Sequence, residues 1–307
     1  MEHRNIGSLR VSVIGLGCNN FGRRLDQAAT TDVVRAAMDA GINFFDTANI
    51  YGIGESETQL GKALGSDRAD VLIASKFGMD MGGGEKGARP EYIHQAVDAS
   101  LRRLGTDYID LYQLHTPDED VPIADTLGAM RELVRMGKVR EIGCSNFSVA
   151  QLEEAAAVPG GPGFVSVQNH HSLLHREPEE GLLDWCRANS TGFIPFFPLQ
   201  NGLLTGKYRL DRDRPQGTRL SEGERGDRLL TEANLRLVED LIAFASRQDR
   251  SLLELAFGWL LTFDAVSSVI AGATSAAQVQ GNAASGGWRL NEAERDEVLG
   301  ILSDHSA

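Results

Sequence analysis

Polar side chains follow a series of short apolar segments. Asp46 ends the apolar run at residues 42–46, Lys76 ends the run at 71–76, and His115 follows the run at 109–114. Two later runs end in a hydroxyl and amides, at Ser145, Asn146, Gln168 and Asn169. An acid, a lysine, a histidine and amides that converge in one place form a polar pocket suited to chemistry. We therefore expect a functional site at the ends of these runs.

Asp46, Lys76, His115 and the nearby Tyr51 make a coherent acid–base set. Reduction of a carbonyl needs a hydride donor and a proton donor, and a tyrosine hydroxyl can supply the proton. Its ordinary pKa is about 10, and we expect the ammonium of Lys76 to lower it. A carboxylate paired with the lysine keeps the lysine charged. Histidine can orient the carbonyl oxygen by a hydrogen bond, and nothing in this set needs a metal.

The elements that must position these residues alternate between apolar strands and amphipathic helices. Apolar residues recur at spacings of three and four before Gly41, Gly105 and Gly137, each of which suits a helix end. The strands are expected at residues 11–17, 42–46, 71–74, 109–114, 139–143, 164–167, 192–197 and 266–271. This alternation predicts parallel strands covered by helices.

The fold predicted from this count of strands is a (β/α)8 TIM barrel of the α/β class, spanning residues 1–307 as a single domain. The carboxyl ends of barrel strands meet at one rim, where active sites form. Residues 205–227 form the longest irregular stretch, and loops of such length in compact domains are usually functional. Residues 291–302 are expected to form one more amphipathic helix.

Composition narrows the setting of the protein. The net charge of -13 argues against a nucleic-acid or anionic-membrane partner, since both attract basic surfaces. The three cysteines, Cys18, Cys144 and Cys186, form no CxxC pair and favour a reducing, cytoplasmic location. No apolar run is long enough to span a membrane, and the first residues lack a signal-peptide core. Composition does not predict the oligomeric state.

Several longer motifs resemble those of the aldo-keto reductase superfamily, and together they cover nearly the whole chain. They are G-I-N-F-F-D-T-A-N-I-Y-G-I-G-E-S-E (41–57), S-L-R-R-L-G-T-D-Y-I-D-L-Y-Q-L-H (100–115), M-G-K-V-R-E-I-G-C-S-N-F (136–147) and F-F-P-L-Q-N-G-L-L-T-G-K-Y (196–208). The resemblance implies a nicotinamide-dependent enzyme that reduces an aldehyde or ketone, or oxidises the alcohol. It makes Tyr51 the general acid–base, tuned by Lys76 and Asp46, with His115 orienting the substrate.

The resemblance also implies a set of cofactor-binding residues. Ser145, Asn146 and Gln168 would hold the nicotinamide carboxamide, and Phe196 would stack on its ring. The others are expected near the ribose (Cys18, Asn19, with Asp46 beside them), the phosphates (Phe197, Pro198, Leu199, Lys207, Arg219) and the adenosine end (Gly272, Thr274, Gln278, Asn282). This last segment lacks the lysine and arginine that clamp a 2′-phosphate in other branches, and Gly281 replaces a usual acid. NADP(H) is expected as the preferred cofactor, with NAD(H) as the other option.

A small carbonyl or alcohol substrate is expected against Asn20, Phe21, Phe77 and Phe147.

Three alternative functions remain open. The first is a cofactor-binding regulatory protein resembling the beta subunits of potassium channels. A Rossmann dehydrogenase is a second, because Gly15-Leu16-Gly17 begins a dinucleotide motif that then has Asn20 in place of a glycine. A zinc hydrolase using His170, His171 and His175 is a third. We expect no metal, and a packing role for His171.

Overall fold

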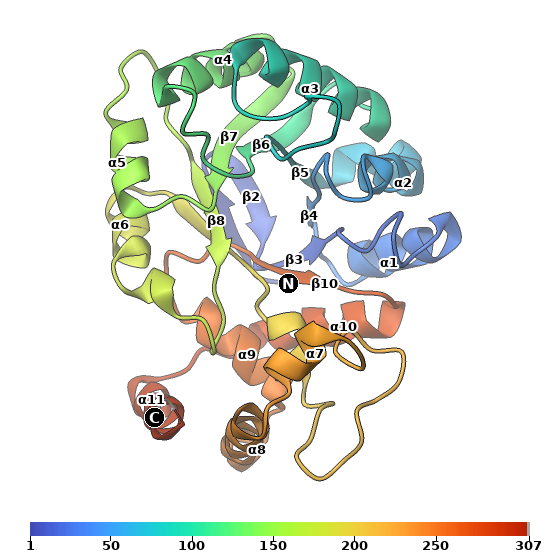
Figure 1. Cartoon of the computed structure of the whole chain (residues 1–307), viewed down its shortest axis with the longest axis vertical. Coiled ribbons are helices and arrows are strands. Elements are labelled where there is room, and N and C mark those ends of the chain that lie inside the picture. Colours follow the sequence, from blue (N-terminus) through green and yellow to red (C-terminus); the bar gives the residue numbers. More distant parts are fainter. Residues whose placement is uncertain (306–307) are drawn as a thin grey trace.

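Eight parallel strands form the centre of the molecule (Figure 1), which is described by a computed structural model for residues 1–305. Their order in the sheet is β10-β3-β4-β5-β6-β7-β8-β9. Their bounds are β3 Ile14–Gly17, β4 Phe44–Asp46, β5 Leu72–Phe77, β6 Ile109–Leu114, β7 Val139–Ser145, β8 Ser166–His170, β9 Gly192–Phe196 and β10 Val269–Gly272. Each strand therefore lies within, or within three residues of, a run of the sequence that was expected to be a strand.

The sheet closes between β9 and the residues just before β10. The backbone N–H of Phe193 donates to Ala265 at 2.8 Å, and the N–H of Ser267 donates to Phe193 at 2.9 Å. These bonds join the two outer strands of the sheet and complete the ring. The expected TIM barrel is confirmed, and the open sheet of a Rossmann dehydrogenase is excluded.

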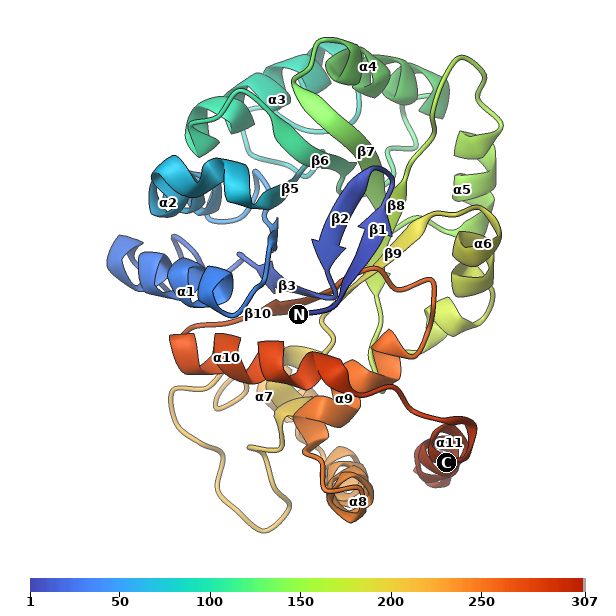
Figure 2. The same cartoon turned by 180° about the vertical axis from the view of Figure 1, so that it is seen from behind.

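Helices surround the barrel on its outer side in both views (Figures 1 and 2). Their bounds are α1 Gln27–Asp39, α2 Glu55–Leu64, α3 Pro90–Leu104, α4 Ile123–Arg135, α5 Val149–Ala156, α6 Leu182–Ala188, α7 Glu224–Leu229, α8 Glu232–Arg247, α9 Leu252–Leu261, α10 Ala276–Ala284 and α11 Glu292–Asp304, with short 3-10 turns at Gly65–Asp70, Glu177–Glu179, Gln200–Thr205 and Ser285–Gly287.

The helix α3 shows how local sequence sets these bounds. Pro90 is its first residue, and Gly105 ends it in the left-handed conformation, with φ 65°. A proline suits the first turn because its missing N–H would have no partner there, and glycine adopts a positive φ without strain. Ile93, Val97 and Leu104 form its buried face against the barrel. Both ends of this helix were expected from the sequence.

The amino-terminal residues form a hairpin that covers one end of the barrel. The antiparallel strands β1 (His3–Ile6) and β2 (Leu9–Ser12) turn at Gly7, where φ is 54°. Figure 2 shows the hairpin in front of the barrel strands. Ile6, Leu9 and Val11 pack with apolar side chains of the barrel interior: Phe44, Ala74, Leu111, Ile194 and Ile270. The hairpin thus acts as an apolar plug.

The single strand expected at residues 11–17 is therefore wrong. Its first part belongs to the hairpin, and only Ile14–Gly17 enters the barrel. The two parts pair with different neighbours, β1 and β4, so one run of apolar residues serves two sheets. Hydrophobic periodicity alone does not distinguish these two environments, because both bury their apolar side chains.

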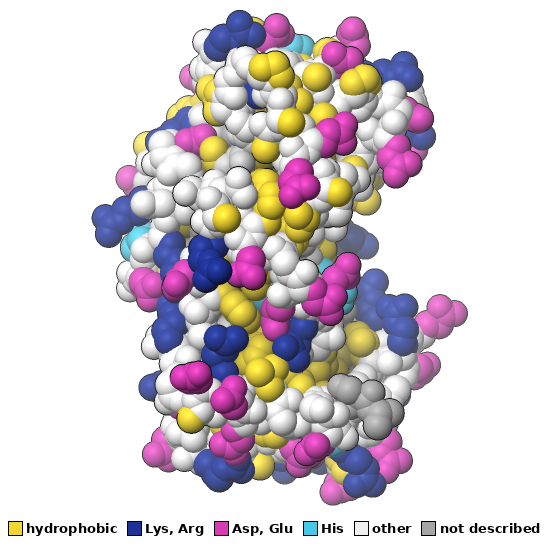
Figure 3. Space-filling view, turned by 90° about the vertical axis from the view of Figure 1, so that its left-hand side faces the viewer, with side chains coloured by type: hydrophobic (Ala, Val, Ile, Leu, Met, Phe, Trp, Pro, Cys, Tyr) yellow, Lys and Arg dark blue, Asp and Glu magenta, His cyan; other side chains and the backbone are white. Residues whose placement is uncertain are grey.

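The long segment after β9 is held in part by contacts within the segment itself. Leu220 is fully buried, and its N–H donates to the hydroxyl of Tyr208 at 3.2 Å. The helix α7 begins at Glu224, so the irregular stretch is shorter than the expected 205–227. Elsewhere on the surface, acidic and basic side chains are interspersed, as on the side that carries α5 and α6 (Figure 3). Within residues 1–305, no helix has the length and apolar character needed to cross a membrane.

Candidate active site

The site is built around a buried ion pair at the carboxyl ends of β4 and β5. The ammonium of Lys76, which is fully buried, donates to both carboxylate oxygens of Asp46 at 2.8 and 2.7 Å. It also donates to the carbonyl oxygen of Thr47 at 2.9 Å, a partner that the sequence did not suggest. A buried charge is tolerated when it is paired and hydrogen-bonded in this way. Adjacent parallel strands bring the two side chains together.

Tyr51 lies next to this pair. The Lys76 nitrogen is 5.2 Å from the centre of the Tyr51 ring. Burial raises the pKa of the Tyr51 hydroxyl, and the positive charge of Lys76 only partly counteracts that effect. The expectation that Lys76 would bring this pKa below its ordinary value is therefore wrong in direction. Desolvation of the phenolate outweighs attraction to the ammonium, so the hydroxyl stays protonated at neutral pH.

Lys76 stays charged despite its burial. Burial by itself would lower the pKa of its ammonium, but the Asp46 carboxylate and Tyr51 outweigh that effect, and the pKa is raised. Asp46 is held from a second side by Gln168, whose side-chain amide donates to it at 2.8 Å. The carboxylate is thus fixed by strands from opposite parts of the barrel.

His115 follows β6 and faces Tyr51 edge-on, with ring centres 5.9 Å apart and planes at 80°. Burial, followed by the charge of Lys76, lowers the pKa of His115 to about 3. The imidazole is therefore neutral under physiological conditions. Its buried Nδ1 has no hydrogen-bond partner among residues 1–305. An unpaired buried atom of this kind is free to form a hydrogen bond with a bound molecule.

The ends of β7 and β8 continue the rim. The Ser145 hydroxyl donates to the carbonyl oxygen of Gln168 at 2.6 Å. Asn146 has a positive φ of 62°, and its side chain donates to the carbonyl oxygen of His115 at 2.9 Å. The structure therefore brings together Asp46, Lys76, His115, Ser145, Asn146 and Gln168, which were all expected at this rim.

Aromatic rings line the end of β9. The ring of Phe196 stacks on His170 with centres 5.5 Å apart, and His170 stacks on His175 at 3.9 Å. Phe197 is 39% exposed and has a positive φ of 52°, which is strained for a phenylalanine. Strained backbone of this kind clusters at binding sites. Pro198 and Leu199 follow directly, before the 3-10 turn Gln200–Thr205.

The segment after β10 approaches the loop after β3. A side chain built on Gly272 would lie 3.3 Å from the side-chain oxygen of Asn19, and that oxygen is buried without a partner in the described part of the chain. Gln278 accepts from the N–H of Thr274 at 2.8 Å and so holds the turn that starts α10. Asn282 is buried on α10. Glycine here permits a close approach of backbone to a ligand.

Cations lie beyond these residues on the loop after β9. Arg219 donates to the side-chain oxygen of Asn20 at 3.0 Å, and Lys207 is exposed. Together with the aromatic face of Phe196 and the amides at the rim, they form a donor set that suits a phosphate-bearing nicotinamide cofactor. Cys18, by contrast, is fully buried, and its N–H donates to the carbonyl oxygen of Asp46 at 2.8 Å.

The residues expected against the substrate lie deeper than the rim. Phe21 and Phe77 are fully buried, Phe147 is 3% exposed, and all three belong to the main hydrophobic core. Phe77 stacks on Tyr112 with ring centres 4.9 Å apart. Asn20 is buried between Arg219 and the carbonyl oxygen of Ala273. Their burial gives no support to substrate contact for these side chains.

The histidines proposed for a zinc site have other partners. His171 is fully buried and bonds Glu179 at 3.0 Å, and Glu179 also accepts from Trp259 at 3.0 Å. Among residues 1–305, no group of three or more His, Cys, Asp or Glu side chains is arranged to hold a metal ion. The position of His171 agrees with a packing role.

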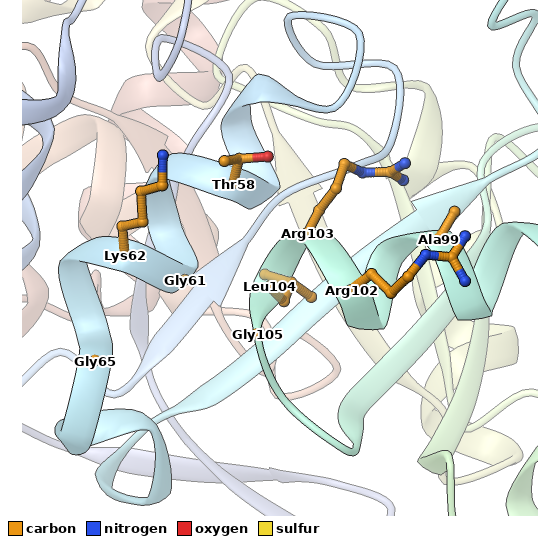
Figure 4. A pocket seen from close by; sticks show the side chains of 9 residues that line it. All are labelled: Thr58, Gly61, Lys62, Gly65, Ala99, Arg102, Arg103, Leu104 and Gly105. Atoms are coloured by element: carbon orange, nitrogen blue, oxygen red, sulfur yellow. The ribbon is translucent and has the colours of Figure 1, made fainter.

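A surface groove lies away from this rim. Figure 4 shows it between α2 and α3, with a volume of about 560 Å³, lined by Thr58, Gly61, Lys62, Gly65, Ala99, Arg102, Arg103, Leu104 and Gly105. Its glycines and exposed cations include none of the acid–base residues. The groove is a gap between two outer helices and lies apart from the candidate active site.

Comparison with known proteins finds matches over nearly the whole chain. The model of the aldo/keto reductase family matches residues 13–302. The L-glyceraldehyde 3-phosphate reductase of Escherichia coli is 35% identical, over 92% of this chain and 86% of its own length. A probable voltage-gated potassium channel subunit beta of Oryza sativa is 33% identical, over 92% of this chain and 90% of its own length. The solved structure of a glycerol dehydrogenase from Gluconobacter oxydans superimposes with a TM-score of 0.86 at 28% identity, covering 99% and 96% of the two chains.

The closed barrel, the polar rim and these matches over nearly the whole chain lead to one conclusion: the chain belongs to the aldo/keto reductase family and is an oxidoreductase.

Proposed function

We propose that this protein reduces an aldehyde or ketone with NADPH, or oxidises the corresponding alcohol, with Tyr51 as the proton donor and acceptor. One observation carries the proposal. The buried ion pair of Lys76 and Asp46 lies beside Tyr51, and a neutral His115 faces the Tyr51 ring edge-on. A purely structural role would not require a charged pair, a phenol and an imidazole in one buried cluster.

The proposed proton transfer follows from the charge states. When bound, a nicotinamide supplies the hydride. The Tyr51 hydroxyl, whose pKa is raised by burial, gives its proton to the carbonyl oxygen. Lys76 stabilises the phenolate that remains, and Asp46 keeps Lys76 charged. His115, whose pKa is lowered to about 3, acts as a neutral hydrogen-bond donor that orients the carbonyl.

The raised pKa of Tyr51 keeps the enzyme at neutral pH in the protonated form that reduction uses. Reduction needs the protonated phenol, which is the form that burial stabilises. Oxidation of an alcohol needs a base, and the phenolate forms only at high pH. We therefore expect the oxidation rate to rise with pH over a range in which the reduction rate stays level.

Residues of the rim and the long loop are proposed to hold the cofactor. Ser145, Asn146 and Gln168 offer amides and a hydroxyl for the carboxamide, and Phe196 offers a ring face. Arg219 and Lys207 offer positive charge for the phosphates, and the segment 272–282 lies beside Asn19 for the adenosine end. NADP(H) is proposed as the preferred dinucleotide.

The regulatory alternative is supported by the similarity to the Oryza sativa protein, a probable voltage-gated potassium channel subunit beta. The four acid–base residues of this chain nevertheless lie together, and the pKa shifts favour a charged Lys76, a protonated Tyr51 and a neutral His115. A protein that only sensed a cofactor would not need a proton donor. Turnover is therefore the better proposal.

The proposed setting follows from the chain as a whole. We propose one domain over residues 1–307 and a small carbonyl substrate. The net charge of -13 favours neither a nucleic-acid nor a membrane partner, and we propose none. The three free cysteines, all buried, agree with a cytoplasmic location.

A fluorescence titration with NADPH and then NADH, followed by addition of 4-nitrobenzaldehyde, tests this function. Tight binding followed by oxidation of the dinucleotide on adding the aldehyde is expected, with tighter binding of NADPH. Binding without oxidation of either dinucleotide, across aldehydes of different size, would favour the regulatory alternative. Absence of binding would contradict the proposed cofactor residues.

A further inference from the structure

Four arginines gather around the turn that follows β3, beside the candidate active site. Arg23 and Arg24 lie in this turn, Arg219 lies in the loop after β9, and Arg225 lies on α7. We call these four residues the arginine cluster. Only Arg219 was suggested by the sequence analysis, although Arg23 and Arg24 form a visible basic pair three residues after Asn20 in an acidic chain.

Asn20 accepts hydrogen bonds from three members of the cluster. Its carbonyl oxygen accepts from the backbone N–H of Arg23 at 3.3 Å and of Arg24 at 2.9 Å. Its side-chain oxygen accepts from the guanidinium of Arg219 at 3.0 Å. Arg219, which is 199 positions from Asn20 in the chain, is thus brought to the turn that holds Arg23 and Arg24 by one buried asparagine.

The fourth member is brought in by close packing of α7. A side chain built on Gly226 would lie 2.5 Å from the carbonyl oxygen of Leu220, so α7 lies directly against the segment that carries Arg219. Burial, followed by the charges of Arg24, Arg225 and Arg23, lowers the pKa of Arg219. The positive charges of the cluster are thus close enough to oppose one another.

The protein does not neutralise this cluster with its own acids. In the same segment, Arg209 pairs with Glu239 at 2.5 Å and Arg214 pairs with Asp227 at 2.8 Å. None of the four cluster arginines forms an ion pair with any residue in 1–305, although the net charge of the chain is -13. Gathered like charges destabilise a fold, and an anion that binds them removes the repulsion.

The cluster lies between the acid–base residues and the segment after β10. The Cγ of Arg23 would lie 3.6 Å from a side chain built on Gly52, the residue after Tyr51. On the other side, the side-chain amide of Asn20 donates to the carbonyl oxygen of Ala273 at 3.1 Å. Both the substrate side and the adenosine side of the site are within reach of the cluster.

We propose that Arg23, Arg24, Arg219 and Arg225 form a phosphate-binding site at the mouth of the barrel. Guanidinium groups bind phosphate through paired, charge-assisted hydrogen bonds. The phosphate belongs either to the dinucleotide or to a phosphorylated carbonyl substrate. Both of these sources presuppose the proposed function. Positive charge from the turn and α7 would replace the basic residues that the segment 272–282 lacks.

Calorimetric titration with inorganic pyrophosphate tests the site without depending on turnover. The variants are Arg23→Gln/Arg24→Gln and Arg225→Gln, and the matched control is Arg35→Gln/Arg102→Gln, which removes two exposed arginines that have no ion pair within residues 1–305. The double cluster variant is expected to weaken binding by about tenfold or more, since a charge-assisted hydrogen bond is worth that much. Equal binding by all the variants and the wild type, or no binding by any, would overturn the proposal.

Two further comparisons, one of dinucleotide affinity and one of kcat/KM, identify the source of the phosphate. If the cluster binds the 2′-phosphate, the double variant loses affinity for NADPH but not for NADH; if it binds the diphosphate, affinity for both falls together. If it binds a substrate phosphate, kcat/KM falls for glyceraldehyde 3-phosphate and not for glyceraldehyde. If the wild type binds pyrophosphate but oxidises neither dinucleotide with any aldehyde, the proposed function fails while the phosphate site stands. Unchanged values in all these comparisons would also contradict the cluster.

Discussion

Two buried aspartates at opposite ends of the barrel have different surroundings. Asp110, near the start of β6, is fully buried and accepts from Arg68 at 2.8 Å, Arg140 at 2.8 Å and the N–H of Ile73 at 2.9 Å. Asp46, at the end of β4, is held by Lys76 and Gln168. Asp110 thus ties neighbouring strands together, whereas Asp46 fixes a buried charge beside a phenol.

The ends of the barrel differ in the same way. The amino-terminal end is closed by an apolar hairpin, with Ile6 and Leu9 packed into the barrel. The carboxyl-terminal end carries the unpaired Nδ1 of His115 and positive φ angles at Asn146 and Phe197. Unpaired buried atoms and strained backbone reduce stability. The contrast agrees with the proposal that the chemistry takes place at the carboxyl-terminal end.

The largest effect is expected for Lys76→Met. Loss of the ammonium removes the charge that stabilises the Tyr51 phenolate, so turnover should fall by a factor of about 100 or more. The decline of the reduction rate at high pH should shift to still higher pH, because the pKa of the Tyr51 hydroxyl rises further without the charge of Lys76. Unfolding titrations should show a loss of about 3–5 kcal/mol, because the carboxylate of Asp46 is left buried and unpaired.

The double variant Lys76→Met/Asp46→Asn separates the fall in turnover from the loss of stability. It should recover part of the stability, since no uncompensated charge remains, while turnover stays low. A wild-type pH–rate profile in Lys76→Met would contradict the proposed role of the lysine.

Asp110→Asn should act on stability alone. The substitution removes the charge that Arg68 and Arg140 share, so the free energy of unfolding should fall by about 1.5–3 kcal/mol. The kcat of the folded variant should match the wild type, because Asp110 lies at the other end of the barrel from Tyr51. A fall in kcat comparable to that of Lys76→Met would remove the distinction between the two ends.

A smaller effect is expected from acid. The folded pKa of His115 is about 3, below the ordinary value of 6.5, so the unfolded chain binds the proton more readily. The stability that this histidine contributes is full above pH 6.5 and is lost as the pH falls toward 3. Melting temperatures measured between these limits should fall less steeply in His115→Gln. Parallel curves for the variant and the wild type would count against burial of a neutral imidazole.

The smallest effect is expected from metal removal. Neither end of the barrel, within residues 1–305, holds a group of three ligand side chains. Dialysis against a chelator should leave the reduction rate unchanged. Loss of activity that zinc restores would revive the hydrolase alternative and place chemistry on His170 and His175.

Much of the barrel could be predicted because its signals are local. The bounds of α3 follow from Pro90 and Gly105, and β6 was expected at its observed residues. Asp46, Lys76 and His115 could be placed at one rim because parallel strands end together. The hairpin was missed because Val11 belongs to an apolar run, 11–17, that serves two sheets, although the Gly7-Ser8 pair is a turn signal.

The parts of the site that could not be predicted depend on three-dimensional surroundings. The direction of the Tyr51 pKa shift is a balance between desolvation and the charge of Lys76, and sequence shows only the charge. Phe21 and Phe77 look like pocket residues by position, but they pack into the core. Arg225 joins Arg219 only through the packing of α7.

Single-turnover oxidation of bound NADPH by 4-nitrobenzaldehyde, in the wild type and in Tyr51→Phe, tests the central claim most directly. The variant keeps the ring beside Lys76 and removes only the hydroxyl. The account predicts nearly unchanged NADPH affinity and an oxidation rate lower by about 100-fold or more. An oxidation rate equal to that of the wild type would show that Tyr51 is not the proton donor.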